Sequence, residues 1–199
     1  MNNLLLAAII LLSACSGPNP NPIKRAKVRR AEAYSTDGYV QMVVEIPAGI
    51  NHWYSYDEVK KRIVIRQKEG EDELINFLPM PGNYGFIPHT QDSEGHPLQA
   101  LLLSESLPLG AIEEIIPIGG LLLKENGAVK TLLLAVPVDS TKRIIQATDF
   151  ATFLVEYDAA KRIIEEWFTH YKGSMQTAEL GWRNEIYCIS LIEKMAKKK

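Results

Sequence analysis

The folded part of the chain is expected to begin near Tyr39, where apolar positions start to recur along the sequence. Residues 40–46 carry apolar side chains at every second position, the period that is typical of a β-strand. This spacing places Glu45 on the face opposite those side chains. Two further strands are predicted over 53–56 and 62–66, on either side of a charged turn.

Four short apolar runs follow, and glycine, proline or asparagine separates them: 101–103, 112–116, 121–123 and 132–138. Runs of this length bounded by such residues are predicted to be strands. The Asn-Gly pair within 124–127 is a strong signal for a hairpin turn.

Helical spacing is confined to the C-terminal third. Residues 158–171 place five apolar side chains on one face of a helix: Ile163, Ile164, Trp167, Phe168 and Tyr171. A second helix is predicted from Asn184 to about Lys197, and its buried side carries Cys188, Leu191, Ile192 and Met195. Cys188 is interpreted as a small core residue and not as a nucleophile. Strands first and helices last predict an α+β domain around a closed or nearly closed β-barrel.

The first fifteen residues have a different pattern. Residues 4–12 form an unbroken apolar run, whose helical length of about 14 Å is too short to cross a membrane core of about 30 Å. Such a run followed by small residues is typical of a signal peptide. Leu12-Ser13-Ala14-Cys15 resembles the bacterial lipobox, which implies lipidation of Cys15. An N-terminal helix buried in the fold is the alternative.

This interpretation divides the chain into three parts. Residues 1–14 are the signal peptide, residues 15–38 are a lipidated tether rich in Pro, Asn and basic residues, and residues 39–199 are the folded domain. We expect an extracytoplasmic, membrane-anchored lipoprotein, in the periplasm or at the outer membrane of a Gram-negative host. The basic run 24–30 is then a solvated linker or lies on the anionic membrane surface.

The composition of the chain excludes several other classes of protein. Hydrophobic residues make up 46% and charged residues 23%, which excludes a disordered or fibrous chain. The net charge of −2 argues against a nucleic-acid partner. With Cys15 lipidated, Cys188 has no partner for an intrachain disulfide.

Three segments, in order, resemble the soluble family I inorganic pyrophosphatases: Glu45–Gly49, Pro81–Thr90 and Glu94–Leu103. The family has E-I-P, then N-Y-G-[FY]-I-P-x-T, then D-G-D-P-x-D-[VA]-L in these places. The likeness extends from about Val40 to the C terminus. It implies a five-stranded β-barrel of OB type with additional hairpins and C-terminal helices. It also implies hydrolysis of diphosphate to two phosphates with several Mg²⁺ ions, and an assembly of several copies.

The resemblance also implies which residues form the site. The catalytic positions are Glu45, Tyr84, Tyr171 and Lys172. The substrate-binding positions are Arg66, Asn83 and Lys172, which would hold diphosphate or another small phosphorylated anion. The metal positions that keep a carboxylate are Glu94 and Glu125.

Three other metal positions depart from the family, because His96, Gln99 and Lys130 stand where it has acids. Leu132 and Trp53 stand where it has lysines. The six positions that are acidic in the family therefore carry a formal charge of only −2, from three glutamates and one lysine. Several Mg²⁺ ions need a dense set of oxygen ligands, so we expect weak or lost Mg²⁺ binding.

Several alternatives stay open at this level. Lys130 is expected to form a salt bridge with Glu94 or Glu125. His96 either ligates a softer metal such as Zn²⁺ with those two glutamates or lines a plain polar pocket. Trp53 either caps the site or packs within it.

Two functions are consistent with the sequence. One is a lipid-anchored diphosphatase that is active despite its altered ligands. The other, which the residues favour, is a non-catalytic module that binds an anion or a partner protein. In the second case Glu45, Tyr84, Tyr171 and Lys172 are a phosphate-binding remnant or a hydrogen-bonded core network.

Overall fold

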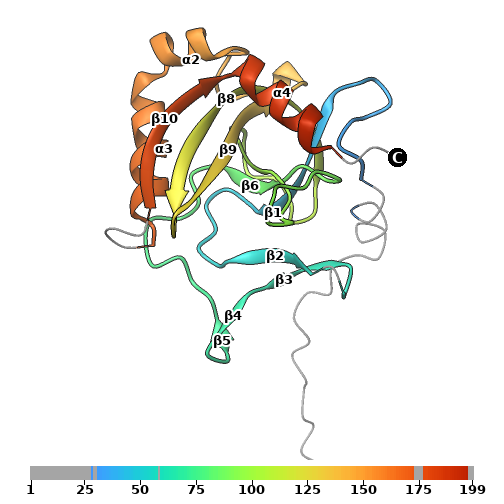
Figure 1. Ribbon diagram of the computed structural model, residues 1–199, viewed down its shortest axis with the longest axis vertical. Coiled ribbons are helices and arrows are strands. Elements are labelled where there is room, and N and C mark those ends of the chain that lie inside the picture. The colour runs from blue at the N-terminus through green and yellow to red at the C-terminus, as the bar shows by residue number, and fades with distance from the viewer. Residues whose placement is uncertain (1–27, 29–30, 58, 173–176, 197–199) are drawn as a thin grey trace, which may run out of the picture.

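A computed structural model describes residue 28 and residues 31–57, 59–172 and 177–196. Its main sheet has six strands in the order β1-β6-β7-β9-β8-β10, and β1 also pairs with β8. Five strands therefore form a closed ring, and β10 adds to its outside (Figure 1). The pairs are antiparallel except for β7 with β9. The bounds are β1 Val40–Ile46, β6 Asn83–Phe86, β7 Gln99–Leu102, β8 Ile112–Glu125, β9 Ala128–Pro137 and β10 Thr177–Asn184.

Three α-helices follow the ring strands in sequence, which confirms the predicted α+β class. They are α2 Phe150–Glu156, α3 Asp158–His170 and α4 Glu185–Met195, and a short 3-10 turn, η1, spans Ser140–Lys142. Figure 1 shows α3 beside β10 and α4 across the ends of the ring strands. No helix in the described part of the chain is both long and apolar enough to span a membrane.

Two small hairpins extend from the ring (Figure 1). One joins β2 Tyr54–Asp57 to β3 Arg62–Ile65, and the other joins β4 Gln67–Lys68 to β5 Glu71–Asp72. The first hairpin confirms the two strands predicted around the charged turn.

The Asn-Gly turn is a hairpin, as predicted. Asn126 and Gly127 have φ angles of 48° and 86°, and Glu125 pairs with Ala128 across the turn. Asparagine and glycine adopt this left-handed conformation at little cost. The runs 112–116 and 121–123 are parts of one long strand, because the irregularity between Pro117 and Gly119 bends β8 without ending it.

Strand β1 is buried on both faces, although its spacing predicted one open face. Met42 lies in the core of the ring with the inner face of α4, while Val43 packs with Val28, Ala31 and Phe86 on the other side. Packed chain therefore begins upstream of Tyr39, at residues the sequence indicated as tether.

The two predicted helices are confirmed with small corrections. Ile163 on α3 is 62% exposed, so it does not share the buried face of Ile164, Trp167 and Phe168. Helix α4 begins after Asn184, whose side chain accepts a hydrogen bond from the N–H of Tyr187. Cys188 is fully buried, and burial raises the pKa of its thiol to about 12, which agrees with a core role.

Candidate anion-binding site

A cleft of about 890 Å³ receives side chains from all five strands of the ring. Most of the residues that the sequence singled out line it: Glu45, Arg66, Tyr84, His96, Gln99, Glu125, Lys130, Tyr171 and Lys172. Glu94 lies at its edge through a contact with Lys130. Asn83 is not among the lining residues.

Strand register brings the central side chains to one face. Gln99 on β7 pairs with Leu132 on β9, and Lys130 lies two residues before Leu132. Lys130 pairs with Leu123 on β8, two residues before Glu125. Side chains two residues apart share a face of a sheet, so these positions all point toward the cleft.

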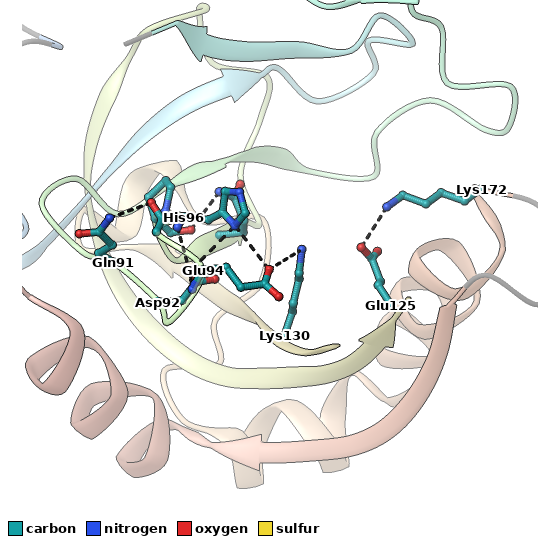
Figure 2. A network of polar contacts seen from close by, with 10 residues as sticks. Gln91, Asp92, Glu94, His96, Glu125, Lys130 and Lys172 are labelled. Atoms are coloured by element: carbon teal, nitrogen blue, oxygen red, sulfur yellow. Dashed lines mark hydrogen bonds and ion pairs between the residues drawn. The ribbon is translucent and has the colours of Figure 1, made fainter. Parts of the chain in front are cut away.

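Lys130 lies among the positions where the resemblance predicts metal ligands. Its Nζ is 3.8 Å from Oε2 of Glu94, and Nδ1 of His96 is 3.6 Å from the same oxygen (Figure 2). The predicted salt bridge of Lys130 is therefore formed with Glu94.

Glu125 forms an ion pair with a different lysine, Lys172. Lys172, directly after α3, places its Nζ 3.0 Å from Oε2 of Glu125, and Figure 2 shows this pair apart from His96. Glu125 is therefore not grouped with His96 and Glu94 in this structure, and a metal shared by the three stays a prediction.

Asp92 lies beside Glu94 and His96 and completes a group of three possible metal ligands. Ligand atoms of Asp92, Glu94 and His96 lie within 4.8 Å of one another. Asp92 Oδ1 also accepts the backbone N–H groups of Glu94, at 2.9 Å, and His96, at 2.8 Å. Sequence reasoning missed this residue, and the Asp-x-Glu-x-His spacing was the signal that could have found it.

The side chains present do not fit a cluster of Mg²⁺ ions. Mg²⁺ takes oxygen ligands in near-octahedral geometry, and several ions together need many carboxylates. Of the carboxylates at these positions, Glu94 faces an ammonium and an imidazole, and Glu125 faces the ammonium of Lys172. The two lysine ammonium groups already pair with the carboxylates that a metal would need.

Trp53 packs within the site as part of a stacked column. Its ring lies 5.5 Å from the Tyr171 ring at an interplanar angle of 2°, and Tyr171 in turn stacks on Trp167. The Arg66 guanidinium lies 5.5 Å from the Trp53 centroid, and Arg66 Nε is 3.0 Å from Glu73 Oε2. Aromatic stacking and the ion pair together orient Arg66 at the cleft.

Two tyrosine hydroxyls face the same space and stay protonated at neutral pH. Burial raises the pKa of Tyr84 well above its ordinary value, and the neighbouring Tyr171 raises it further. Burial, followed by the charge of Glu125, also raises the pKa of Tyr171. Both groups can therefore donate hydrogen bonds to an anion.

Glu45 is the buried carboxyl of the site, with 7% of its surface exposed. Its Oε1 accepts the backbone N–H of Tyr56 at 2.6 Å. Burial raises the pKa of Glu45 to about 7, although the Tyr56 N–H and the charge of Arg66 act in the opposite direction. The carboxyl is therefore divided between its two protonation states near neutral pH.

Glu45 should make the folded state lose stability as pH rises. An unfolded glutamate titrates near 4.5, so between that pH and 7 the native state binds more protons than the unfolded state. We expect the contribution of Glu45 to the free energy of unfolding to fall by roughly 3 kcal/mol across this window. Urea unfolding at a series of pH values measures it. Glu45→Gln should remove this part of the slope, and an equal slope in both proteins would contradict the assignment.

Asn83 holds loops together instead of reaching the cleft. Its Oδ1 accepts the N–H groups of Ala48, at 3.1 Å, and Leu107, at 2.8 Å. Its Nδ2 donates to Ser104 Oγ at 3.0 Å and to the Glu105 carbonyl at 2.9 Å. The side-chain amide of Asn83 is buried, and these four bonds use both of its N–H donors and both acceptor positions of its oxygen. These contacts give Asn83 a structural role in the described part of the chain, and its substrate-binding role stays a prediction.

Fold and site together define a class: an α+β domain with an OB-like ring of strands and a cleft lined by charged and aromatic side chains. Residues 42–199 match the family model described as inorganic pyrophosphatase. This match covers most of the chain, which therefore belongs to the inorganic pyrophosphatase family.

Individual relatives agree with this assignment. The chain is 34% identical to the inorganic pyrophosphatase of Sulfolobus acidocaldarius over 134 residues, which is 67% of this chain and 73% of that protein. Among solved structures, inorganic pyrophosphatase from Thermus thermophilus superposes with a TM-score of 0.69 at 25% identity, covering 79% of this chain and 88% of that one. The enzyme from Neisseria gonorrhoeae gives 0.70 at 26% identity, covering 85% and 96%.

Proposed function

We propose that this chain is a diphosphate-binding member of the family in which Mg²⁺-dependent hydrolysis is weak or lost. The observation that carries this proposal is the Lys130 ammonium, 3.8 Å from Glu94 among the positions expected to hold metal. His96 and Gln99 add no permanent negative charge there. A site that must hold several divalent cations needs an excess of carboxylate charge instead.

The groups that would bind a phosphate are present in the same cleft. Arg66 and Lys172 offer charge-assisted hydrogen bonds, and Tyr84 and Tyr171 offer neutral donors. Mg²⁺, where the family uses it, activates water and neutralises the leaving phosphate. The chain's own residues support the binding and orientation of the anion more than its cleavage.

Side-by-side assay of diphosphate hydrolysis tests the proposal, with the Sulfolobus acidocaldarius relative as the control. With Mg²⁺, Mn²⁺ or Zn²⁺ we expect turnover at least about 10²-fold below that relative, since removing even one stabilising group costs about that much. Comparable turnover with any of the three metals would show that the chain is an ordinary diphosphatase.

We also propose that the chain is an extracytoplasmic lipoprotein anchored through Cys15, a residue outside the part that the structure describes. The apolar run 4–12 and the Leu-Ser-Ala-Cys segment support this. Cys15→Ser should move the protein from the membrane fraction to the soluble fraction, whereas the neighbouring Ser16→Ala should not. An unchanged membrane-bound fraction in Cys15→Ser would refute the anchor.

A further inference from the structure

Four basic side chains of the described chain line the cleft. Among the described lining residues, Lys61, Arg66, Lys130 and Lys172 are basic. Three others are acidic: Glu45, Asp92 and Glu125. Glu94, at the edge of the cleft beside Lys130, adds a fourth carboxylate, so the formal charge of the site is 0. The four basic side chains are the groups that an anion in the cleft would contact.

Two of the cations are held in place by ion pairs. Lys130 contacts Glu94, Lys172 contacts Glu125, and the side chains of both lysines are more than a third exposed. Both side chains of the Lys130–Glu94 pair are more than a third exposed, so this pair adds little stability and exchanging Glu94 for a phosphate oxygen costs little. The Lys172–Glu125 pair is less exposed, because the Glu125 side chain is only 15% exposed. A diphosphate that engages two of the cations at once would offer each of them a charge-assisted hydrogen bond in exchange for its carboxylate partner.

The cations also come from separate elements. Arg66 lies between the two small hairpins, Lys130 lies on β9, and Lys172 follows α3. Arg66 is oriented by Trp53 and Glu73, and Lys172 lies 5.4 Å from the ring centroid of Tyr171. The charges therefore approach the cleft from different sides, as recognition of a compact polyanion requires.

We propose that this cleft binds diphosphate without a divalent metal, and that its ammonium and guanidinium groups supply the charge that Mg²⁺ supplies in the family. This inference rests on the proposed function, because it assumes the same ligand in the same cleft. It adds that Mg²⁺ should weaken the binding of diphosphate to this chain instead of supporting it. Mg²⁺ neutralises part of the charge of diphosphate, so it competes with the protein's cations for the anion.

Calorimetric titration of the purified protein with sodium diphosphate tests this, once with excess EDTA and once with saturating Mg²⁺. We expect binding in EDTA, weaker binding in Mg²⁺, and an affinity that falls as salt concentration rises. Lys130→Gln and Lys172→Gln should each weaken binding by about tenfold, the loss of one charge-assisted contact. Lys124→Gln is the matched control, because Lys124 is exposed on the same hairpin next to Glu125 and is not a lining residue.

The outcomes separate the two proposals. Binding that requires Mg²⁺, or that is unchanged in Lys130→Gln, overturns the metal-free inference and leaves the proposed function standing. Absence of binding in both buffers, with the fold verified by circular dichroism, overturns both. Binding in EDTA that weakens with Mg²⁺ and is about tenfold weaker in each lysine variant supports both.

Discussion

Restoring aspartate at the five altered positions is expected to give this protein a Mg²⁺ affinity that the natural chain lacks. The substitutions are Glu94→Asp, His96→Asp, Gln99→Asp, Glu125→Asp and Lys130→Asp. Strand register already directs the positions on β7, β8 and β9 toward one cleft, so backbone rearrangement is unnecessary. With Glu45 ionised, the six positions would change from a formal charge of −2 to −6.

Calorimetry with Mg²⁺ alone measures the effect. We expect the restored protein to bind at least about tenfold more tightly than the natural chain, which corresponds to about 1.4 kcal/mol. Its melting temperature should also rise when Mg²⁺ is added, because a ligand that binds only the folded state stabilises that state. A variant with asparagine at the same five positions has similar shape without the charge and should bind no better than the natural chain. Strong Mg²⁺ binding by the natural chain would contradict this account.

Adding Trp53→Lys and Leu132→Lys to the five restored aspartates is expected to recover diphosphate hydrolysis. Restored metals would activate water, but two cations expected to meet the phosphate would still be absent. Leu132 is buried on β9, where a lysine is tolerable only with new carboxylates beside it. Trp53→Lys removes the stack on Tyr171, so Arg66 must then be held by Glu73 alone.

Steady-state assays should show at least about 10²-fold higher turnover than the five-aspartate variant, the usual effect of groups that stabilise developing charge. Glutamine at positions 53 and 132 in the same background is the control, because it preserves length without the charge. Full turnover in the five-aspartate variant alone would show that the two lysines are dispensable.

The sequence was most informative where structure is set locally. Asn126 and Gly127 define their turn because they tolerate positive φ, and α3 follows from apolar side chains at helical spacing. Strand β10 has no such pattern, since most of its residues are exposed or half-buried. Its conformation comes from pairing with β8, a contact distant in sequence. Helix α2 was missed because it has only seven residues, although Asp149 caps its N terminus.

In the site, too, the sequence predicted some features and tertiary contacts decide the others. Family motifs identified the residues of the cleft, but not how they pair with one another. Three features of the site depend on tertiary contacts that the sequence does not reveal. Lys130 pairs with Glu94 and not with Glu125, Asp92 lies beside Glu94 and His96, and Trp53 stacks on Tyr171. Val43 illustrates this for the fold, because a period of two cannot reveal that upstream chain covers the second face of β1.

The pairing of Lys130 with Glu94 also constrains the evolutionary history of the site. Reversal of Lys130 to aspartate alone would place two carboxylates side by side without a cation between them. A new carboxylate at position 96 or 99, gained first, would instead strengthen the network around Lys130 and make that lysine harder to lose. Neighbouring substitutions of this kind are not additive. Because both partners of the ion pair are more than a third exposed, each single step changes the stability of the fold only slightly, and the order of the substitutions matters mainly for the charge of the site.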